Sequence, residues 1–292
     1  MTASSHRGAG RLTDAVGNRL DGAPLVVLLD LDGTLAPIAA TPEGAQVPAE
    51  TKEVLRRLIA TPGLFLAVVS GRSAQDAASL AGVDGLWVVG NHGFESREPR
   101  GDIVPDDRVL PFERAVADVA RDLAVLESSV PGSLVENKRW TLSVHYRLVD
   151  PAAVPSLKER VRESGERAGL RASEGKQVME LRPAVEISKG TASVALAERL
   201  GGLTGAGNVI YAGDDRTDED AFRALRARSR SAVTVRIVAD EAPEFRVPTE
   251  AEFALSSPAE LRVALEWLAA RRSAREALKR VSSRPDARGP PS

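Results

Sequence analysis

Two short apolar runs, each ending in a polar turn, constrain the fold most strongly. Residues 25–29 (LVVLL) lead directly into DLDGT at residues 30–34, and residues 64–69 (LFLAVV) lead into SGR at residues 70–72. Continuous apolar runs of this length are typical of parallel strands that are covered on both faces. We therefore expect a parallel sheet whose functional side chains lie at the carboxyl ends of its strands.

Segments with helical spacing alternate with these runs. In residues 47–60 the apolar residues Val54, Leu55 and Leu58 recur on one side of a helix. The same rhythm returns from Ser188, where helix, strand, helix and strand patterns follow one another up to an amphipathic segment that ends near Arg272. This alternation predicts an α/β fold with a doubly wound, Rossmann-like parallel sheet.

The middle of the chain breaks this rhythm. Between the two α/β halves we expect a long helix, a strand pair around residues 133–149, a second helix, and a strand around residues 177–183. Together they predict an inserted α+β cap domain. The expected boundaries are a flexible tail over 1–22, a core over 23–106 and 186–270, a cap over 107–185, and a flexible tail over 271–292.

Composition excludes several classes of function. The net charge is −2 and aromatic residues are 4% of the 292, so a basic, aromatic surface for nucleic acid is not expected. No apolar run reaches the roughly 20 residues that cross a bilayer. Cysteine is absent, which suits a reducing cytosol. We expect a cytoplasmic monomer that binds a small molecule and neither nucleic acid nor membrane.

Two acidic clusters follow apolar strands. Asp30 and Asp32 lie two residues apart, and neighbouring carboxylates repel unless a cation or proton lies between them. The hard ion Mg²⁺ accepts such oxygens together with those of phosphate. A plain Asx turn is the alternative. In residues 213–220 (GDDRTDED), Thr217 or Asp218 is the expected helix cap, which leaves Asp214 and Asp215 as a metal ligand and its support.

Two further strand ends carry groups that suit a phosphate. Ser70 offers a hydroxyl and a backbone N–H beside the start of a helix. Lys189 opens a helix, where a cation is unfavourable for the helix dipole unless it has another partner. Pairing with Asp30 and a phosphate would explain its position, and an exposed lysine is the alternative.

The four motifs, in this order, resemble those of the haloacid dehalogenase-type phosphatases. The resemblance implies that Asp30 is the nucleophile, that Asp32 is the general acid and base, and that Ser70 and Lys189 hold the phosphoryl group. It implies Mg²⁺ held by Asp30, the carbonyl of Asp32, and Asp214, with Asp215 and Asp218 in support. Thr34, Gly71 and Arg72 are expected to border the substrate.

Polar residues elsewhere suit a ligand rich in hydroxyl groups. Asn91 and His92 lie in GNHG, and the predicted cap carries Lys138, His145 and Arg147 in ENKRWTLSVHYR and Lys176, Glu180 and Arg182 in GKQVMELRP. Each of them has an ordinary structural explanation when taken alone. Together they resemble the trehalose-6-phosphate phosphatases, which implies that these eight residues bind the sugar.

Other functions stay open at this point. Asn91 replaces a more frequent small residue, which leaves room for another disaccharide or pseudo-disaccharide phosphate as the substrate. A non-catalytic sugar-phosphate sensor on the same fold is an alternative of a different class, although the expected nucleophile, lysine and acidic residues are all present.

Overall fold

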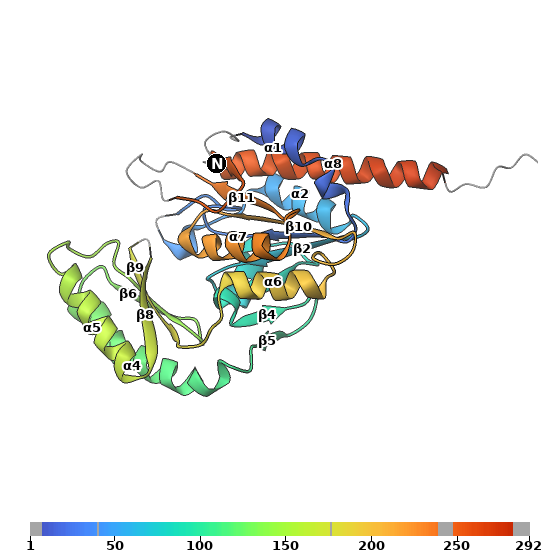
Figure 1. The fold of residues 1–292 in the computed structure, drawn as a ribbon. Helices are drawn as coiled ribbons and strands as arrows, with labels where there is room; N and C mark the ends of the chain where they lie inside the picture. Colours follow the sequence, from blue (N-terminus) through green and yellow to red (C-terminus); the bar gives the residue numbers. More distant parts are fainter. Residues whose placement is uncertain (1–7, 40, 176, 239–247, 283–292) are drawn as a thin grey trace, which may run out of the picture.

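A large and a small β-sheet organise the computed structural model (Figure 1), which describes residues 8–39, 41–175, 177–238 and 248–282. The larger, the core sheet, has eight strands in the order β12-β11-β10-β1-β2-β3-β4-β5. Neighbours from β12 to β3 pair in parallel, and β4 and β5 are antiparallel additions. The strands are β1 (Leu25–Leu29), β2 (Leu64–Val69), β3 (Trp87–Gly90), β4 (Glu95–Arg97), β5 (Ile103–Pro105), β10 (Asn208–Gly213), β11 (Val233–Ile237) and β12 (Phe253–Leu255).

Helices cover both faces of the core sheet, which confirms the predicted doubly wound α/β fold. Alternate residues of β1 point to opposite faces of the core sheet. Val27 packs in a cluster with four helices on one face, and Leu28 packs in a cluster with two helices on the other. The first group is α1 (Ala9–Val16), α2 (Ala49–Ile59), α3 (Ala74–Ala81) and α8 (Pro258–Ser282), and the second is α6 (Lys189–Arg199) and α7 (Arg216–Arg228).

The smaller sheet, called the second sheet below, is antiparallel in the order β6-β7-β9-β8. Its strands are β6 (Leu134–Asn137), β7 (Leu142–His145), β8 (Leu170–Gly175) and β9 (Val178–Pro183), and its helices are α4 (Glu113–Ser129) and α5 (Val154–Arg167). Along β9, Met179 and Leu181 are buried against these helices, while Glu180 and Arg182 alternate with them on the other face. The second sheet therefore presents a polar face to the core sheet (Figure 1).

Several short strands were not predicted. β8 pairs with β9 along its whole length, yet its sequence, LRASEG, is polar and ends in glycine. β4, β5 and β12 have three residues each, which is too short for a period-2 pattern to stand out. Pairing with a neighbouring strand, rather than local preference, stabilises these segments.

The prediction of flexible tails is wrong for residues 8–22 and 271–282. Leu12 and Val16 are four apart on α1 and share one face, Leu20 lies in the short helical turn that follows, and all three are at most 2% exposed. They pack in one cluster with residues of α8. Arg271 of α8 donates two hydrogen bonds of 2.9 and 2.8 Å to Asp21. Residues 1–7 and 283–292 lie outside the described residues.

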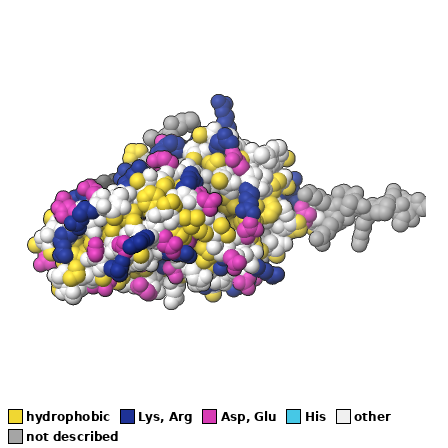
Figure 2. Space-filling view, turned by 90° about the horizontal axis from the view of Figure 1, so that it is seen from below, with side chains coloured by type: hydrophobic (Ala, Val, Ile, Leu, Met, Phe, Trp, Pro, Cys, Tyr) yellow, Lys and Arg dark blue, Asp and Glu magenta, His cyan; other side chains and the backbone are white. Residues whose placement is uncertain are grey.

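Charge is mixed on the face of the molecule seen in Figure 2. Lys and Arg side chains lie among Asp and Glu side chains there, with hydrophobic groups between them. That face offers no continuous basic surface. None of the described helices combines the length and the apolar character that crossing a membrane requires.

Asp21→Asn tests whether the N-terminal segment is docked. A hydrogen bond from Arg271, its charge and that of Arg275 lower the pKa of Asp21 despite partial burial. A carboxylate with a lowered folded-state pKa stabilises the fold above its unfolded pKa of about 3.9, and the effect is lost as the pH falls through the folded-state value. Urea titration at pH 7 should show a loss of about 1 kcal/mol, shrinking below pH 4. Asp14→Asn, an exposed change on α1, should cost nothing, and equal stability of both variants would contradict the docking.

Candidate active site

A cavity of about 1550 Å³ lies between the carboxyl edge of the core sheet and the polar face of the second sheet. The core sheet contributes predicted residues from the ends of four strands and the start of α6: Asp30, Asp32, Ser70, Gly71, Arg72, His92, Lys189, Asp214 and Asp215. The second sheet contributes Lys138, His145, Arg147, Glu180 and Arg182. The structure thus brings most of the predicted site residues to a single cavity.

Lys189 is buried at the centre of the acidic cluster. Its side chain is 2% exposed, and its Nζ donates to Asp30 Oδ1 at 2.7 Å and to Asp218 Oδ1 at 2.9 Å. A capping box of Ser188 and Thr191 starts α6 at this lysine, next to the end of β1. The carboxylates outweigh the unfavourable helix dipole, so the predicted Lys189–Asp30 pair is present and the exposed-lysine alternative is wrong.

Asp218 on α7 organises the acidic loop. It is fully buried, and its Oδ1 also accepts a hydrogen bond from Tyr211 Oη at 2.7 Å. Its Oδ2 accepts from the backbone N–H groups of Asp214 and Asp215, both at 3.0 Å. These four bonds occupy the lone pairs of the carboxylate, so Asp218 is suited to orient the loop.

The site concentrates negative charge away from water. Burial raises the pKa of Asp30 well above its usual range, and Asp218 and Asp214 raise it further while Lys189 opposes them. Burial likewise raises the pKa of Asp218 to about 6. One ammonium group therefore faces several carboxylates, and a second cation would lower the cost of keeping them ionised.

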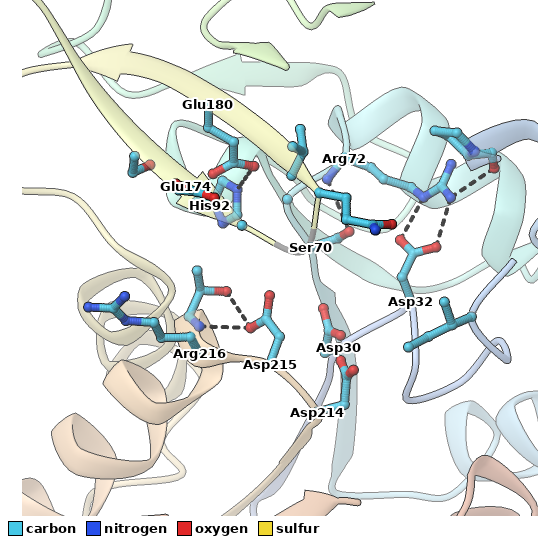
Figure 3. Close-up of a pocket in the computed structure, with 18 of the residues that line it drawn as sticks. Asp30, Asp32, Ser70, Arg72, His92, Glu174, Glu180, Asp214, Asp215 and Arg216 are labelled. Carbon is cyan, nitrogen blue, oxygen red and sulfur yellow. Dashed lines mark hydrogen bonds and ion pairs between the residues drawn. The ribbon is translucent and has the colours of Figure 1, made fainter. Parts of the chain in front are cut away.

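Asp30, Asp214 and Asp218 place one carboxylate oxygen each within 4.8 Å of the others. Gly33 makes room for this arrangement, because a Cβ there would lie 2.3 Å from Asp214 Oδ2, and its φ of +82° is in the left-handed region. Because hydrogen bonds already use the lone pairs of Asp218, the candidate ligands are carboxylate oxygens of Asp30 and Asp214, which are of the kind that Mg²⁺ prefers. The residues present therefore fit a small divalent cation. Figure 3 shows Asp30 and Asp214 adjacent, with Asp32 farther off.

Asp215 has a different position from the one predicted. Its Oδ1 accepts hydrogen bonds from the N–H groups of Thr217 and Asp218, which makes it the N-cap of α7. The expectation that Thr217 or Asp218 caps this helix is wrong, and Asp215 is not in the acidic triad. Although burial opposes it, the charge of Lys189 lowers the pKa of Asp215 to about 2.

Arg72 holds the side chain of Asp32. Its Nε and Nη2 donate to the two carboxylate oxygens at 2.7 Å each, and Nη2 also donates to the carbonyl of Pro42 at 2.9 Å. Asp32 consequently points toward Arg72 (Figure 3), and its side chain is 42% exposed to the cavity. Ser70 Oγ accepts the N–H of Arg72 at 3.1 Å, which keeps the serine hydroxyl at the end of β2.

Polar residues meet across the interface of the two sheets. His92 Nε2 lies 3.1 Å from Glu180 Oε1 (Figure 3), and Lys138 Nζ donates to the carbonyl of Gly71 at 3.2 Å. Burial acts against ionisation of Glu180, yet His92 and Lys138 outweigh it and lower the pKa of Glu180 well below its usual range. The absence of a side chain at Gly71 is needed here, because a Cβ would lie 2.6 Å from the ring of His92.

The remaining residues of the second sheet are paired along the cavity wall. His145 Nε2 lies 2.9 Å from Glu136 Oε2, Arg147 donates to the carbonyl of Ala39 at 2.9 Å, and Arg182 donates to Ser173 Oγ at 3.2 Å. Glu136 was not predicted, although it lines the cavity. Its place near the end of a predicted strand, two residues before Lys138, was the available signal.

Two predicted substrate contacts are not at the cavity. Thr34 and Asn91 are fully buried, and neither lines it. The side chain of Asn91 is fully used by other partners, since it donates to Glu95 at 2.9 Å and accepts from Thr141 at 2.7 Å. The structure does not bring either side chain to the cavity wall, where a bound sugar would meet it. Lys176 lies outside the described residues.

The aspartate, serine and lysine at neighbouring strand ends, beneath an inserted sheet, are characteristic of the haloacid dehalogenase-type phosphatases, and the fold and the site place the chain in this class. The sequence model described as trehalose-phosphatase matches residues 28–259. The chain belongs to the trehalose-phosphatase family.

Individual relatives and a solved structure are also similar to this chain. A probable trehalose-phosphate phosphatase of Oryza sativa subsp. japonica is 35% identical, over 87% of this chain and 72% of that protein. An uncharacterized glycosyl hydrolase of Mycobacterium tuberculosis is 40% identical over 71% of this chain, which spans only 16% of that protein. A crystal structure of a trehalose-6-phosphate phosphatase related protein matches with a TM-score of 0.72 and 25% identity, covering 87% of this chain and 99% of that one.

Lys189→Met tests the role of the buried ammonium. Removing one partner of a buried ion pair costs about 3–5 kcal/mol, because the remaining charges lose their compensation. In EDTA the free energy of unfolding should fall by about 3 kcal/mol, and Mg²⁺ should stabilise this variant more than the wild type. Lys52→Met on α2 is the matched control and should change neither quantity. Wild-type stability of Lys189→Met in EDTA would show that the lysine does not compensate the cluster.

Proposed function

We propose that this chain hydrolyses trehalose 6-phosphate to trehalose and phosphate. The observation that carries the proposal is the buried Lys189–Asp30 pair directly opposite a polar sheet face. Groups suited to phosphate and groups suited to hydroxyls therefore line the same cavity, which supports the proposal. Membership of the trehalose-phosphatase family supports the choice of sugar. A cytoplasmic location and a monomeric state stay predictions from the sequence.

In the proposed reaction, a carboxylate oxygen of Asp30 attacks phosphorus and forms an aspartyl-phosphate as the bond to the sugar oxygen breaks. Asp32 gives its proton to the leaving sugar oxygen and then takes one from the water that cleaves the intermediate, which releases phosphate and restores Asp30. The two hydrogen bonds from Arg72 must be given up before Asp32 can transfer a proton. Arg72 is then able to bind the phosphate.

Lys189 and Ser70 hold the transferring phosphoryl group in this proposal. Both are almost fully buried, so their hydrogen bonds act in a region of low dielectric, where they are stronger than in water. Lys189 already contacts the nucleophile, and this places its positive charge beside the site of attack.

Mg²⁺ is the cofactor we propose. The carboxylates of Asp30 and Asp214 would hold it together with the backbone carbonyl of Asp32, while Asp218 keeps Asp214 in place through the loop N–H groups. When bound, the ion would reduce the repulsion between these carboxylates and the anionic substrate.

The second sheet is the proposed cap that recognises the sugar. Glu180 and Lys138 border the cavity beside His92, and together they combine acceptors with donors for hydroxyl groups. The cavity exceeds the usual range of about 300–1000 Å³ for small-ligand sites, which leaves room for two sugar rings. Asn91 does not reach the cavity, so its identity no longer argues for a different disaccharide.

Asp30→Asn tests the nucleophile. Phosphate release from trehalose 6-phosphate should fall at least about 10³-fold, because an amide cannot form the aspartyl-phosphate. EDTA should abolish wild-type turnover, and Mg²⁺ should restore it. Asp102→Asn, an exposed change before β5, is the control for expression and folding. Substantial turnover by Asp30→Asn would exclude this mechanism, and binding without turnover by the wild type would favour a sensor.

Glu180→Ala tests recognition of the sugar. The KM for trehalose 6-phosphate should rise about 10- to 100-fold, as expected when a charged hydrogen-bond partner is lost, with kcat/KM for p-nitrophenyl phosphate nearly unchanged. Sucrose 6-phosphate, glucose 6-phosphate and mannosylglycerate phosphate complete the substrate panel. Glu166→Ala, exposed on α5, should behave as wild type. Equal losses of kcat/KM on sugar and aryl phosphates would mean that Glu180 is structural. A wild-type preference for another sugar phosphate would contradict the proposed substrate.

A further inference from the structure

A buried carboxylate lies where the two sheets meet, outside the cavity. Glu95, the first residue of β4, is 6% exposed and does not line the cavity. Its Oε1 accepts hydrogen bonds from the N–H of Ala74 at 2.6 Å and from Asn91 Nδ2 at 2.9 Å. Its Oε2 accepts from Trp140 Nε1 at 2.9 Å. All three partners are neutral N–H donors, so the buried charge depends on every one of them.

Each donor belongs to a different part of the site. Ala74 begins α3, directly after the loop that carries Ser70 and Arg72. Asn91 immediately precedes His92 at the end of β3. Trp140 belongs to the turn between β6 and β7 of the second sheet. Glu95 therefore connects the phosphate loop and the His92 turn with the turn of the second sheet.

Asn91 extends this network toward Lys138. Its Nδ2 also donates to the carbonyl of Lys138 at 3.1 Å, and its Oδ1 accepts from Thr141 at 2.7 Å. Asn91 and His92 both have left-handed backbone conformations, with φ of +49° and +58°, which are uncommon for residues other than glycine. The hydrogen bonds around Asn91 hold this turn, and the turn directs His92 toward Glu180.

Trp140 also lies at the connections between the two sheets. It is fully buried in a small apolar cluster with Phe94, Val109 and Ile187. Val109 precedes α4 on the way into the second sheet, and Ile187 precedes α6 on the way back to the core sheet. The hydrogen bond from Trp140 to Glu95 is thus made close to both chain crossings, and it ties the turn of the second sheet to the core there.

We propose that Glu95 is a positioning residue for sugar recognition, a role that rests on the proposed function. Through Trp140 and Asn91 it places Lys138 and His92, which border the cavity, while it contacts neither Asp30 nor Lys189. Loss of the hydrogen bond from Trp140 alone, with the bonds from Ala74 and Asn91 kept, therefore affects the sugar side of the site and leaves the chemistry at phosphorus intact.

Glu95→Gln distinguishes the hydrogen bonds that Glu95 accepts from the core from the one that it accepts from the second sheet. The amide has one oxygen and one NH₂ group. Because two donors approach Oε1 and one approaches Oε2, the amide oxygen faces Ala74 and Asn91, and the NH₂ group opposes Trp140 Nε1. The core side keeps its hydrogen bonds, and the turn of the second sheet loses its anchor.

The test compares two substrates in Mg²⁺. For Glu95→Gln the KM for trehalose 6-phosphate should rise at least about tenfold, with kcat/KM for p-nitrophenyl phosphate within about threefold of wild type. Trp140→Phe added to Glu95→Gln removes the donor that opposes the NH₂ group. The rise in KM for trehalose 6-phosphate in the double variant should therefore be smaller than the product of the rises in the two single variants. Glu98→Gln, exposed after β4, is the matched control and should match the wild type on both substrates.

Amide hydrogen exchange provides a readout that does not depend on the substrate. In Glu95→Gln, exchange should be faster in residues 138–145 and unchanged in β1 and β10. Unchanged exchange at 138–145, or equal losses on both substrates with faster exchange throughout, would overturn the positioning role. If the wild type hydrolyses only the aryl phosphate, the proposed substrate fails, and the exchange experiment still decides the role of Glu95.

Discussion

The buried ammonium of Lys189 is the interaction on which the rest of the site depends. It lies among carboxylates from two segments that are far apart in the sequence, and its hydrogen bonds to Asp30 and Asp218 connect the end of β1 to the first turn of α7. Without a cation, several buried carboxylates could not all stay ionised at the edge of one sheet. The fold therefore places Asp30, the proposed nucleophile, and Lys189 as one unit, and Asp218 then orders the loop that carries Asp214.

On the side proposed to bind the sugar, polar side chains of the core pair with groups of the second sheet. His92 of the core contacts Glu180 of the second sheet, and Lys138 reaches back to the carbonyl of Gly71. These groups are polar, close to the cavity and already oriented by one another, so a ligand with hydroxyl groups can replace contacts that exist in its absence. Arg72 and Asp32 show the same arrangement on the phosphate side.

The sequence was most informative where function depends on local order. A buried apolar run followed by a polar turn is typical of a strand in a parallel sheet and its carboxyl end. The strand ends that carry Asp30, Ser70 and Asp214, and the helix start at Lys189, could therefore be found from the sequence alone. It was least informative where a side chain has several acceptable uses. Asp215 and Asp218 differ little in a pattern of five acids, and only the course of α7 makes the former a cap and the latter a buried acceptor.

The sequence by itself determined the α/β core, the inserted second sheet and the chemical groups at the strand ends, because hydrophobic periodicity and turn chemistry act over a few residues. Only the tertiary structure decided that the N-terminal segment packs on α8 and that β8 completes the second sheet. It also decided that the Asn91 side chain bonds to Glu95 and does not line the cavity. In each of these cases the partner is distant in the chain. Its distance and burial depend on how the whole chain packs, which no local pattern records.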